Sequence, residues 1–289
     1  ETARPGQLVK RDITQIISPG AHFDERMLKA ERNNFLVAVA ISGKQFGVAA
    51  IDLTTGDFKV AELKSENAVI AELERLNPGE VIYPEESKRL SELIEPNVSV
   101  LNGYEGWVFT LETAEFTLKD HFKVATLDGF GLKGNSAATV AAGGALHYVS
   151  QHLRRDITHF TQLSFYKVSD FLVLDAATLK HLEILEPLHS EGTKPATLYG
   201  ALNRTSTPMG ARRLRDWLSQ PLSSLEKIQK RQEAVAQFIQ NSTTLDQFRE
   251  SLKEVRDLER MISRLSIGSG NARDLVQLHG ALLQIPNIR

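Results

Sequence analysis

The stretch that decides the fold runs from Phe35 to Leu63 and reads FLVAVAISGKQFGVAAIDLTTGDFKVAEL. It contains three apolar runs, Phe35–Ile41, Phe46–Leu53 and Phe58–Leu63, rich in the β-branched and aromatic residues that favour strands. The connections between the runs, residues 42–44 and 54–57, are short and contain glycine, as turns between antiparallel strands do. The pattern therefore predicts an antiparallel meander of three strands.

After the meander, helical and strand patterns alternate along the chain. Residues 65–76 and 87–94 have apolar side chains at helical spacing, and residues 80–83 and 98–101 form brief apolar strands. Two helices follow, at Leu111–Phe122 and in the alanine-rich stretch Asn135–Arg155, before a short β segment at 163–174. Helices that pack against a mixed sheet in this order predict an α/β domain of ribonuclease-H-like arrangement over residues 1–170.

Beyond residue 170 the periodic stretches are helical. Residues 175–185 and 198–202 form two helices, and Thr207-Pro208 places a capping residue before a proline at the first position of the next. Longer amphipathic helices are predicted at 224–240, at 244–265 with a break, and at 272–285. Residues 171–289 are therefore predicted to form a second, all-α domain.

The composition is that of an ordinary globular protein. The chain has 289 residues, 42% hydrophobic and 24% charged, which is enough for packed cores in about two domains. It has no cysteine, and neither a membrane span nor a signal peptide is evident, so a cytoplasmic location is expected. Residues 1–170 carry 18 Lys and Arg against 23 Asp and Glu, and residues 171–289 carry 16 against 13. Neither half has the strong positive excess of a nucleic-acid binder.

The sequence lacks the patterns of common catalytic and cofactor sites. The string 131–136 has the wrong spacing for a phosphate loop, and 52–56 is interpreted as a hairpin turn. A nuclease of the ribonuclease-H type needs a carboxylate in its first strand to hold a divalent metal, and Phe35–Ile41 contains none. The eight histidines include no pair at metal-binding helical spacing with a nearby acid. We therefore predict no catalytic, cofactor-binding or metal-binding residue.

Three arginines recur every four residues near the C-terminus. Arg256, Arg260 and Arg264 form a ridge opposite an apolar helix surface, and such a ridge can contact DNA phosphates. A solvated face with a local ion pair from Asp257 to Arg260 is the alternative interpretation.

Four strings are more specific than these patterns. Residues 206–222 read STPMGARRLRDWLSQPL, residues 174–183 read LDAATLKHLE, residues 255–260 read VRDLER, and residues 9–20 read VKRDITQIISPG. They resemble strings of the MutS family of DNA mismatch repair proteins and follow one another along the chain as they do in that family. Two positions differ: His181 stands where asparagine is usual, and Ala21, just after residues 9–20, stands where threonine is usual. The resemblance extends over essentially the whole chain.

The resemblance implies a middle segment excised from a longer protein. Residues 1–170 would be a connector domain, and 171–289 the first part of a helical core or lever domain. In the family, a mismatch-reading domain precedes the connector, and a DNA clamp and an ATPase that uses ATP and Mg follow in a homodimer. This segment is therefore expected to be no enzyme by itself, to hold no cofactor, to bind DNA weakly or not at all, and to relay between mismatch binding and the ATPase.

The resemblance also implies that the connector offers a docking surface to MutL. By family position, the helix at 111–122, which follows Trp107, carries this surface, with Glu115, Phe116, Thr117 and Lys119 as the docking residues. The alternative for Phe116 is a place in the hydrophobic core.

Two other functions are kept as alternatives. A catalytic ribonuclease-H-like nuclease would show metal-dependent cleavage, and a free-standing helical adaptor would be made as a protein of this size. Without the rest of the helical core, partly uncovered apolar faces on the helices at 224–285 predict self-association or fraying at the C-terminus.

Overall fold

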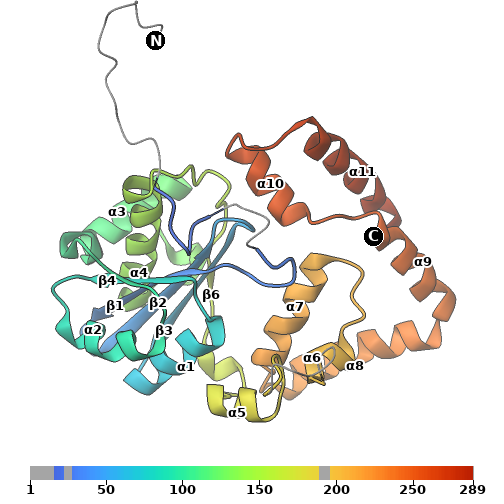
Figure 1. Cartoon of the computed structure of the whole chain (residues 1–289), viewed down its shortest axis with the longest axis horizontal. Coiled ribbons are helices and arrows are strands. Elements are labelled where there is room, and N and C mark those ends of the chain that lie inside the picture. Colours follow the sequence, from blue (N-terminus) through green and yellow to red (C-terminus); the bar gives the residue numbers. More distant parts are fainter. Residues whose placement is uncertain (1–15, 23–27, 189–195, 289) are drawn as a thin grey trace, which may run out of the picture.

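A computed structural model of the chain shows a sheet flanked by helices and joined to an arc of further helices (Figure 1). The structure describes residues 16–22, 28–188 and 196–288. The β-branched pattern of residues 8–17 predicts one further strand, and all of it except residues 16 and 17 lies outside the described residues. We call residues 35–166 the sheet domain and residues 176–288 the helical part.

The predicted meander is confirmed. It consists of β1 (Leu36–Ser42), β2 (Gln45–Asp52) and β3 (Asp57–Leu63), paired antiparallel with Val39 opposite Val48 and Ala49 opposite Val60. In the two turns, Gly43 and Gly56 have φ angles of 61° and 74°, which side chains rarely adopt. Both faces of the strands are buried, and this explains their continuous apolar runs.

The other strands extend the meander at both edges. α1 (Glu66–Leu76) leads to β4 (Glu80–Pro84), and α2 (Lys88–Ile94) leads to β5 (Leu101–Tyr104); β4 pairs parallel with β1, and β5 with β4. β6 (Ser164–Phe165) pairs parallel with β3, so the strand order is β5-β4-β1-β2-β3-β6. The mixed sheet of an α/β domain is therefore confirmed.

Two strand boundaries differ from the prediction. The predicted strand 98–101 begins at Leu101, because a 3-10 turn at Glu95–Asn97 (η1) extends α2. Only two residues of the β segment predicted at 163–174 join the sheet, because a second 3-10 turn at Val168–Asp170 (η5) turns the chain away.

Helices cover both faces of the sheet. α1 and α2 pack on one face, and α3 (Leu111–Phe122) and α4 (Ser136–His147) pack on the other. A π-helical turn, Tyr148–His152 (η4), continues α4, so the helix predicted to reach Arg155 ends earlier. Two further 3-10 turns flank this layer, Gly106–Phe109 (η2) and Asp128–Phe130 (η3). Small residues let α4 approach its neighbours, with Gly47 of β2 against Ala137 and Gly143 against Ala114.

The described chain beyond residue 175 is helical, as predicted. Thr207 caps α7 by accepting a hydrogen bond at Oγ1 from the Gly210 amide at 3.0 Å. The predicted break lies at residues 254–257, and the first helix ends at His181 rather than at Leu185. The helices are α5 (Ala176–His181), α6 (Leu198–Leu202), α7 (Pro208–Ser219), α8 (Leu225–Gln240), α9 (Ser242–Lys253), α10 (Leu258–Ser266) and α11 (Ala272–Ile288).

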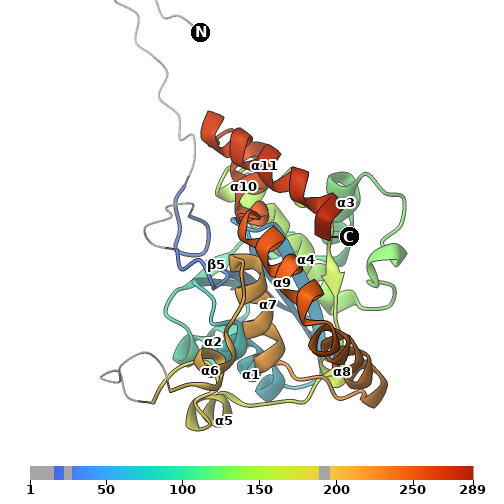
Figure 2. The same ribbon diagram turned by 90° about the vertical axis from the view of Figure 1, so that its right-hand side faces the viewer.

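Helices α8 and α9 lie on the outer side of the helical part (Figure 2). Neither helix contains a buried residue. On α8, the side chains of Leu225, Val235 and Ile239 are more than half exposed. Self-association through these faces stays a prediction. Among the described residues, no helix has the length and apolarity needed to cross a membrane.

The packing of α4 gives a first prediction. Gly143→Ala is expected to lower the free energy of unfolding by about 1–3 kcal/mol, because the new Cβ would lie 2.4 Å from the Cα and Cβ of Ala114. The control is Gly280→Ala in α11, where no atom lies within 4 Å, and it is expected to stabilise by about 0.5–1 kcal/mol. Urea unfolding measures both variants. Equal effects of the two substitutions would contradict the packing argument.

Candidate functional site

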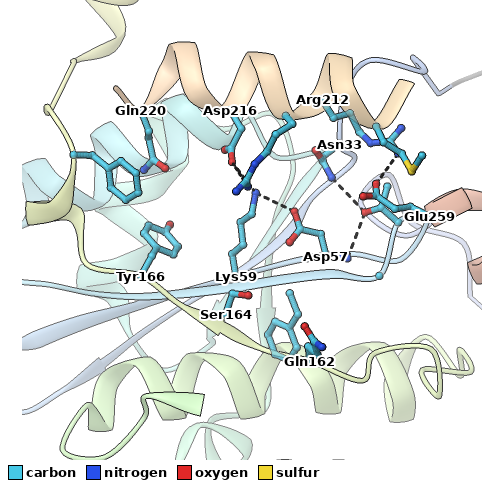
Figure 3. Close-up of a pocket in the computed structure, with 16 residues that line it drawn as sticks. Asn33, Asp57, Lys59, Gln162, Ser164, Tyr166, Arg212, Asp216, Gln220 and Glu259 are labelled. Carbon is cyan, nitrogen blue, oxygen red and sulfur yellow. Dashed lines mark hydrogen bonds and ion pairs between the residues drawn. The ribbon is translucent and has the colours of Figure 1, made fainter. Parts of the chain in front are cut away.

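The sheet domain and the helical part meet where α7 lies over β3 and α1, and a cleft remains between them (Figure 3). The cleft has a volume of about 470 Å³ and a largely polar and charged lining. The residues that line it are Asn33, Thr55, Gly56, Asp57, Phe58, Lys59, Gln162, Ser164, Tyr166, Phe171, Met209, Arg212, Arg213, Asp216, Gln220 and Glu259.

Asp216 of α7 is the acidic residue that contacts two cations of the sheet domain at this interface. The ammonium of Lys59 on β3 lies 3.4 Å from one carboxylate oxygen, and Nη1 of Arg75 on α1 lies 3.4 Å from the other. Each cation also has a closer acidic partner within the sheet domain: Asp57 is 2.9 Å from Lys59, and Glu72 is 2.5 Å from Arg75. Asp216 is therefore a second partner for both.

Burial and charge act against each other in this cluster. Burial raises the pKa of the Asp57 carboxyl, and the neighbouring Lys59 limits the rise. Burial by itself would lower the pKa of Lys59, but the carboxylates of Asp57 and Asp216 outweigh it and raise that pKa. Burial likewise opposes the charge of Arg75, and Glu72 outweighs it, so the Arg75 pKa is also raised. Both cations are therefore charged at neutral pH.

A second set of contacts binds the segment that leads into β1, residues 28–34, here called the leading segment. Arg212 of α7 is 5% exposed, and its Nη1 donates to the carbonyl of Ala30 at 2.8 Å. Both of its terminal nitrogens contact the Asp257 carboxylate at 2.7 Å, and Nη2 contacts Glu259 at 2.6 Å. Burial would lower the Arg212 pKa, but the two carboxylates outweigh it and raise the pKa.

Arg260 of α10 holds the same segment from another helix. Its Nη2 donates to the carbonyl of Lys29 at 2.9 Å and to that of Arg32 at 2.7 Å, and the residue is 7% exposed. Two further bonds join the leading segment to the helical part: Tyr199 donates to Glu31, and Arg32 pairs with Glu186. The leading segment is therefore bound through backbone carbonyls and side chains together.

The carboxylate of Asp52 has a structural role. Asp52 ends β2 and is fully buried. One of its oxygens accepts hydrogen bonds from the Thr54 amide and hydroxyl, and the other accepts from the Asn33 side chain and the Asn34 amide. Its carboxylate is thus used to join the leading segment to the β2–β3 turn. Among the described residues, no group of three or more potential metal ligands is found.

The three arginines predicted to contact DNA do not form one ridge. α10 begins at Leu258, so Arg256 lies before it, in the break, where it is exposed. Arg260 faces inward and binds the leading segment, and Arg264 pairs with Asp274 at 2.7 Å. The prediction of a single exposed ridge is therefore wrong at Arg260, which is 7% exposed and contacts the leading segment. Phosphate contact by Arg256 and Arg264 stays a prediction.

The four predicted docking residues lie together on α3. Lys119 pairs with Glu115 at 2.7 Å, and the Thr117 hydroxyl donates to the Thr113 carbonyl at 2.8 Å. Phe116 is 72% exposed, so the alternative that it belongs to the core is wrong. Ala114 and Leu118 are the residues of α3 that face the core.

Sequence reasoning missed the interface residues Lys59, Arg75 and Asp216. For Arg212 and Arg213 the sequence leaves open the same choice between phosphate contact and a solvated face as for Arg256. The structure separates them: Arg212 is buried, whereas the side chain of Arg213 is 62% exposed. Arg212 directly follows the buried Ala211 in the sequence. The groups that Arg212 contacts, however, lie 45 or more residues away along the chain. No local signal identifies such partners.

Comparison with known proteins gives a consistent result. Residues 34–161 match the family model described as MutS domain II, and residues 177–289 match that described as MutS domain III. The chain is similar to proteins named DNA mismatch repair protein MutS from Symbiobacterium thermophilum (38% identity), Solibacter usitatus (35%) and Methanosarcina acetivorans (37%). Each alignment covers 98% of this chain and 33% of the relative. The chain thus spans about a third of the length of these relatives.

Neighbouring arginines on α7 give a second prediction. Arg212→Lys is expected to lower the free energy of unfolding by about 1–3 kcal/mol, because lysine cannot reproduce the two-nitrogen contact with Asp257 while also reaching Ala30. The same change at the exposed Arg213 is expected to stay within about 0.5 kcal/mol. Thermal and urea unfolding of both variants measure the difference. Indistinguishable variants would contradict the structural role of Arg212.

Proposed function

Because this chain belongs to the MutS family of DNA mismatch repair proteins, we propose that it is the connector and lever segment that couples mismatch binding to the ATPase of the whole protein. The proposal assigns residues 1–170 to the connector and 171–289 to the first part of the lever or core. It assigns no catalytic step and no ATP or Mg to this chain. Mismatched-DNA binding, homodimer formation and a cytoplasmic location in bacteria belong to the whole protein in the same proposal.

The single observation that carries the relay is the binding of the leading segment by Arg212 and Arg260. The leading segment continues directly into β1, the central strand of the sheet domain. A displacement of this segment would therefore act on β1, α7 and α10 together. Packed elements with two discrete arrangements transmit displacements of this kind.

Docking of MutL on α3 is the second element of the proposal. Phe116 exposes an aromatic side chain beside the Glu115–Lys119 ion pair. Aromatic residues are enriched at the centres of protein interfaces, and charged groups at their rims. The face of α3 opposite Ala114 and Leu118 has this composition.

The ribonuclease-H-like description of the sheet domain remains part of the proposal, supported by the antiparallel meander with β4 and β5 parallel to β1. The four hydrogen bonds that occupy Asp52 favour a structural over a nuclease role for this domain.

MutL docking is tested by biolayer interferometry of this chain against the purified MutL ATPase domain. Saturable binding is expected, and Thr117→Arg and Glu115→Lys should weaken it by about tenfold or more, as the loss of a central interface contact does. Glu92→Lys on α2, which packs on the opposite face of the sheet, is the charge-matched control. Equal binding by all variants would move the docking surface away from α3.

The relay is tested by single-molecule energy transfer between dyes on α2 and α8. The chain has no cysteine, so Glu92→Cys and Gln232→Cys introduce the two labelling positions. Arg260→Gln is expected to broaden the distribution of dye-to-dye distances, because two carbonyls of the leading segment lose their donor. Arg256→Gln, at an exposed position four residues earlier, should leave it unchanged. An unchanged distance distribution in Arg260→Gln would contradict the proposed relay through the leading segment.

A further inference from the structure

Helix α7 is attached to the rest of the molecule at both ends. Near its start, Arg212 binds the leading segment. Just after its end, the Leu172 amide donates to the Pro221 carbonyl at 2.8 Å, and Phe171 forms an antiparallel bridge with Leu222. These two attachments define an axis that runs along the helix.

Between the two attachments, Asp216 makes every described ion pair that joins α7 to β3 or α1. It lies one turn beyond Arg212, about 6 Å along the helix axis. Figure 3 shows its carboxylate pointing across the cleft toward Lys59. Asp216 thus sets the angle at which α7 sits over the sheet domain.

The contacts of Asp216 differ in quality from those at the start of α7. Both distances from Asp216 to the sheet domain are 3.4 Å, and the Asp216 side chain is 24% exposed. The contacts of Arg212 are 2.6–2.8 Å long, and its side chain is 4% exposed. Long, partly hydrated ion pairs contribute little and are weakened by salt, whereas buried pairs are screened much less.

Removal of Asp216 from its place would strand no buried charge in the sheet domain. Lys59 would keep Asp57, and Arg75 would keep Glu72. Loss of the Arg212 contacts would instead leave a buried guanidinium without the carboxylates of Asp257 and Glu259, which is strongly unfavourable. Asp257 would keep a longer contact with Arg260, at 3.9 Å. The interface therefore contains one contact that can open at low cost beside one that cannot.

The cleft leaves room for the same motion. Beside Asp216 it is lined by polar side chains such as Gln162, Ser164 and Gln220, and the rest of its lining includes the apolar side chains of Phe58, Phe171 and Met209. The hydrophobic cost of opening it further would come from these apolar side chains alone.

We propose that Asp216 is a releasable positioning residue: its contacts with Lys59 and Arg75 hold α7 in one orientation, and their loss lets α7 rotate about its two end attachments and open the cleft. This inference rests on the proposed relay and assigns the element that switches within it. It places the pivots at the two end attachments of α7 and the switch at Asp216, one helical turn beyond Arg212.

The test uses the same dye pair on α2 and α8 of the 289-residue chain. Asp216→Asn preserves the size of the side chain and removes its charge. It is expected to raise the population of a second distance state by roughly two- to fivefold, the range for loss of a partly exposed ion pair. Asp246→Asn on α9, an exposed aspartate, is the matched control and should leave the populations unchanged.

Salt provides an independent readout that a merely structural role would not move. Raising NaCl from about 0.05 to 0.5 M should populate the second state in the unsubstituted chain and have little further effect in Asp216→Asn. Identical distributions in the two chains at both salt concentrations would overturn the inference. A lower unfolding temperature of Asp216→Asn with an unchanged distribution would also overturn it.

The two proposals fail in different ways. If Arg260→Gln changes the distribution and Asp216→Asn does not, the relay stands and the switch at Asp216 is wrong. If neither variant changes it, both the relay and the switch are wrong. Far-ultraviolet circular dichroism of each variant verifies that the helices remain folded.

Discussion

The attachment of the leading segment to the helical part depends above all on one buried guanidinium, that of Arg212. Moving an ion from water into a protein interior costs several kcal/mol, so such a group is tolerated only where acceptors surround it. Here the acceptors come from three places, the Ala30 carbonyl and the carboxylates of Asp257 and Glu259. Because all three must be present at once, α7, the start of α10 and the leading segment are fixed as one unit. Arg260 adds two more carbonyls of the same segment.

The sheet domain is held together by a different kind of force. Its core is built from small, aliphatic and aromatic side chains, with glycines where α4 meets β2 and α3. Such close packing has few alternative arrangements, so the domain moves as a rigid body. The interface with α7 is polar and contains a cleft. Motion between the two parts is therefore expected at the interface rather than within the sheet.

The chain belongs to the MutS family, and its two candidate functional surfaces lie on different elements. The exposed face of α3 and the interface at α7 lie on separate elements, so substitutions can alter the proposed docking surface and the proposed relay independently. Two of the three arginines assigned to DNA from their spacing make internal contacts. The helical spacing of a charged residue does not reveal whether its side chain contacts solvent, another chain or its own chain. Only the position of its partners in the folded structure decides this.

The sequence by itself determined the local elements. Turn glycines and β-branched runs fix β1, β2 and β3, and the Thr207-Pro208 cap fixes the start of α7, because these signals act between residues close in the chain. Its specific strings also determined the family. Only the tertiary structure decided that Arg212 is buried and Arg213 exposed, that Arg260 faces inward, and that Asp216 meets Lys59 and Arg75. The physical reason is that the stability of a buried charge depends on the acceptors around it, and those acceptors come from residues as distant as Lys29 and Asp257, which only folding brings together.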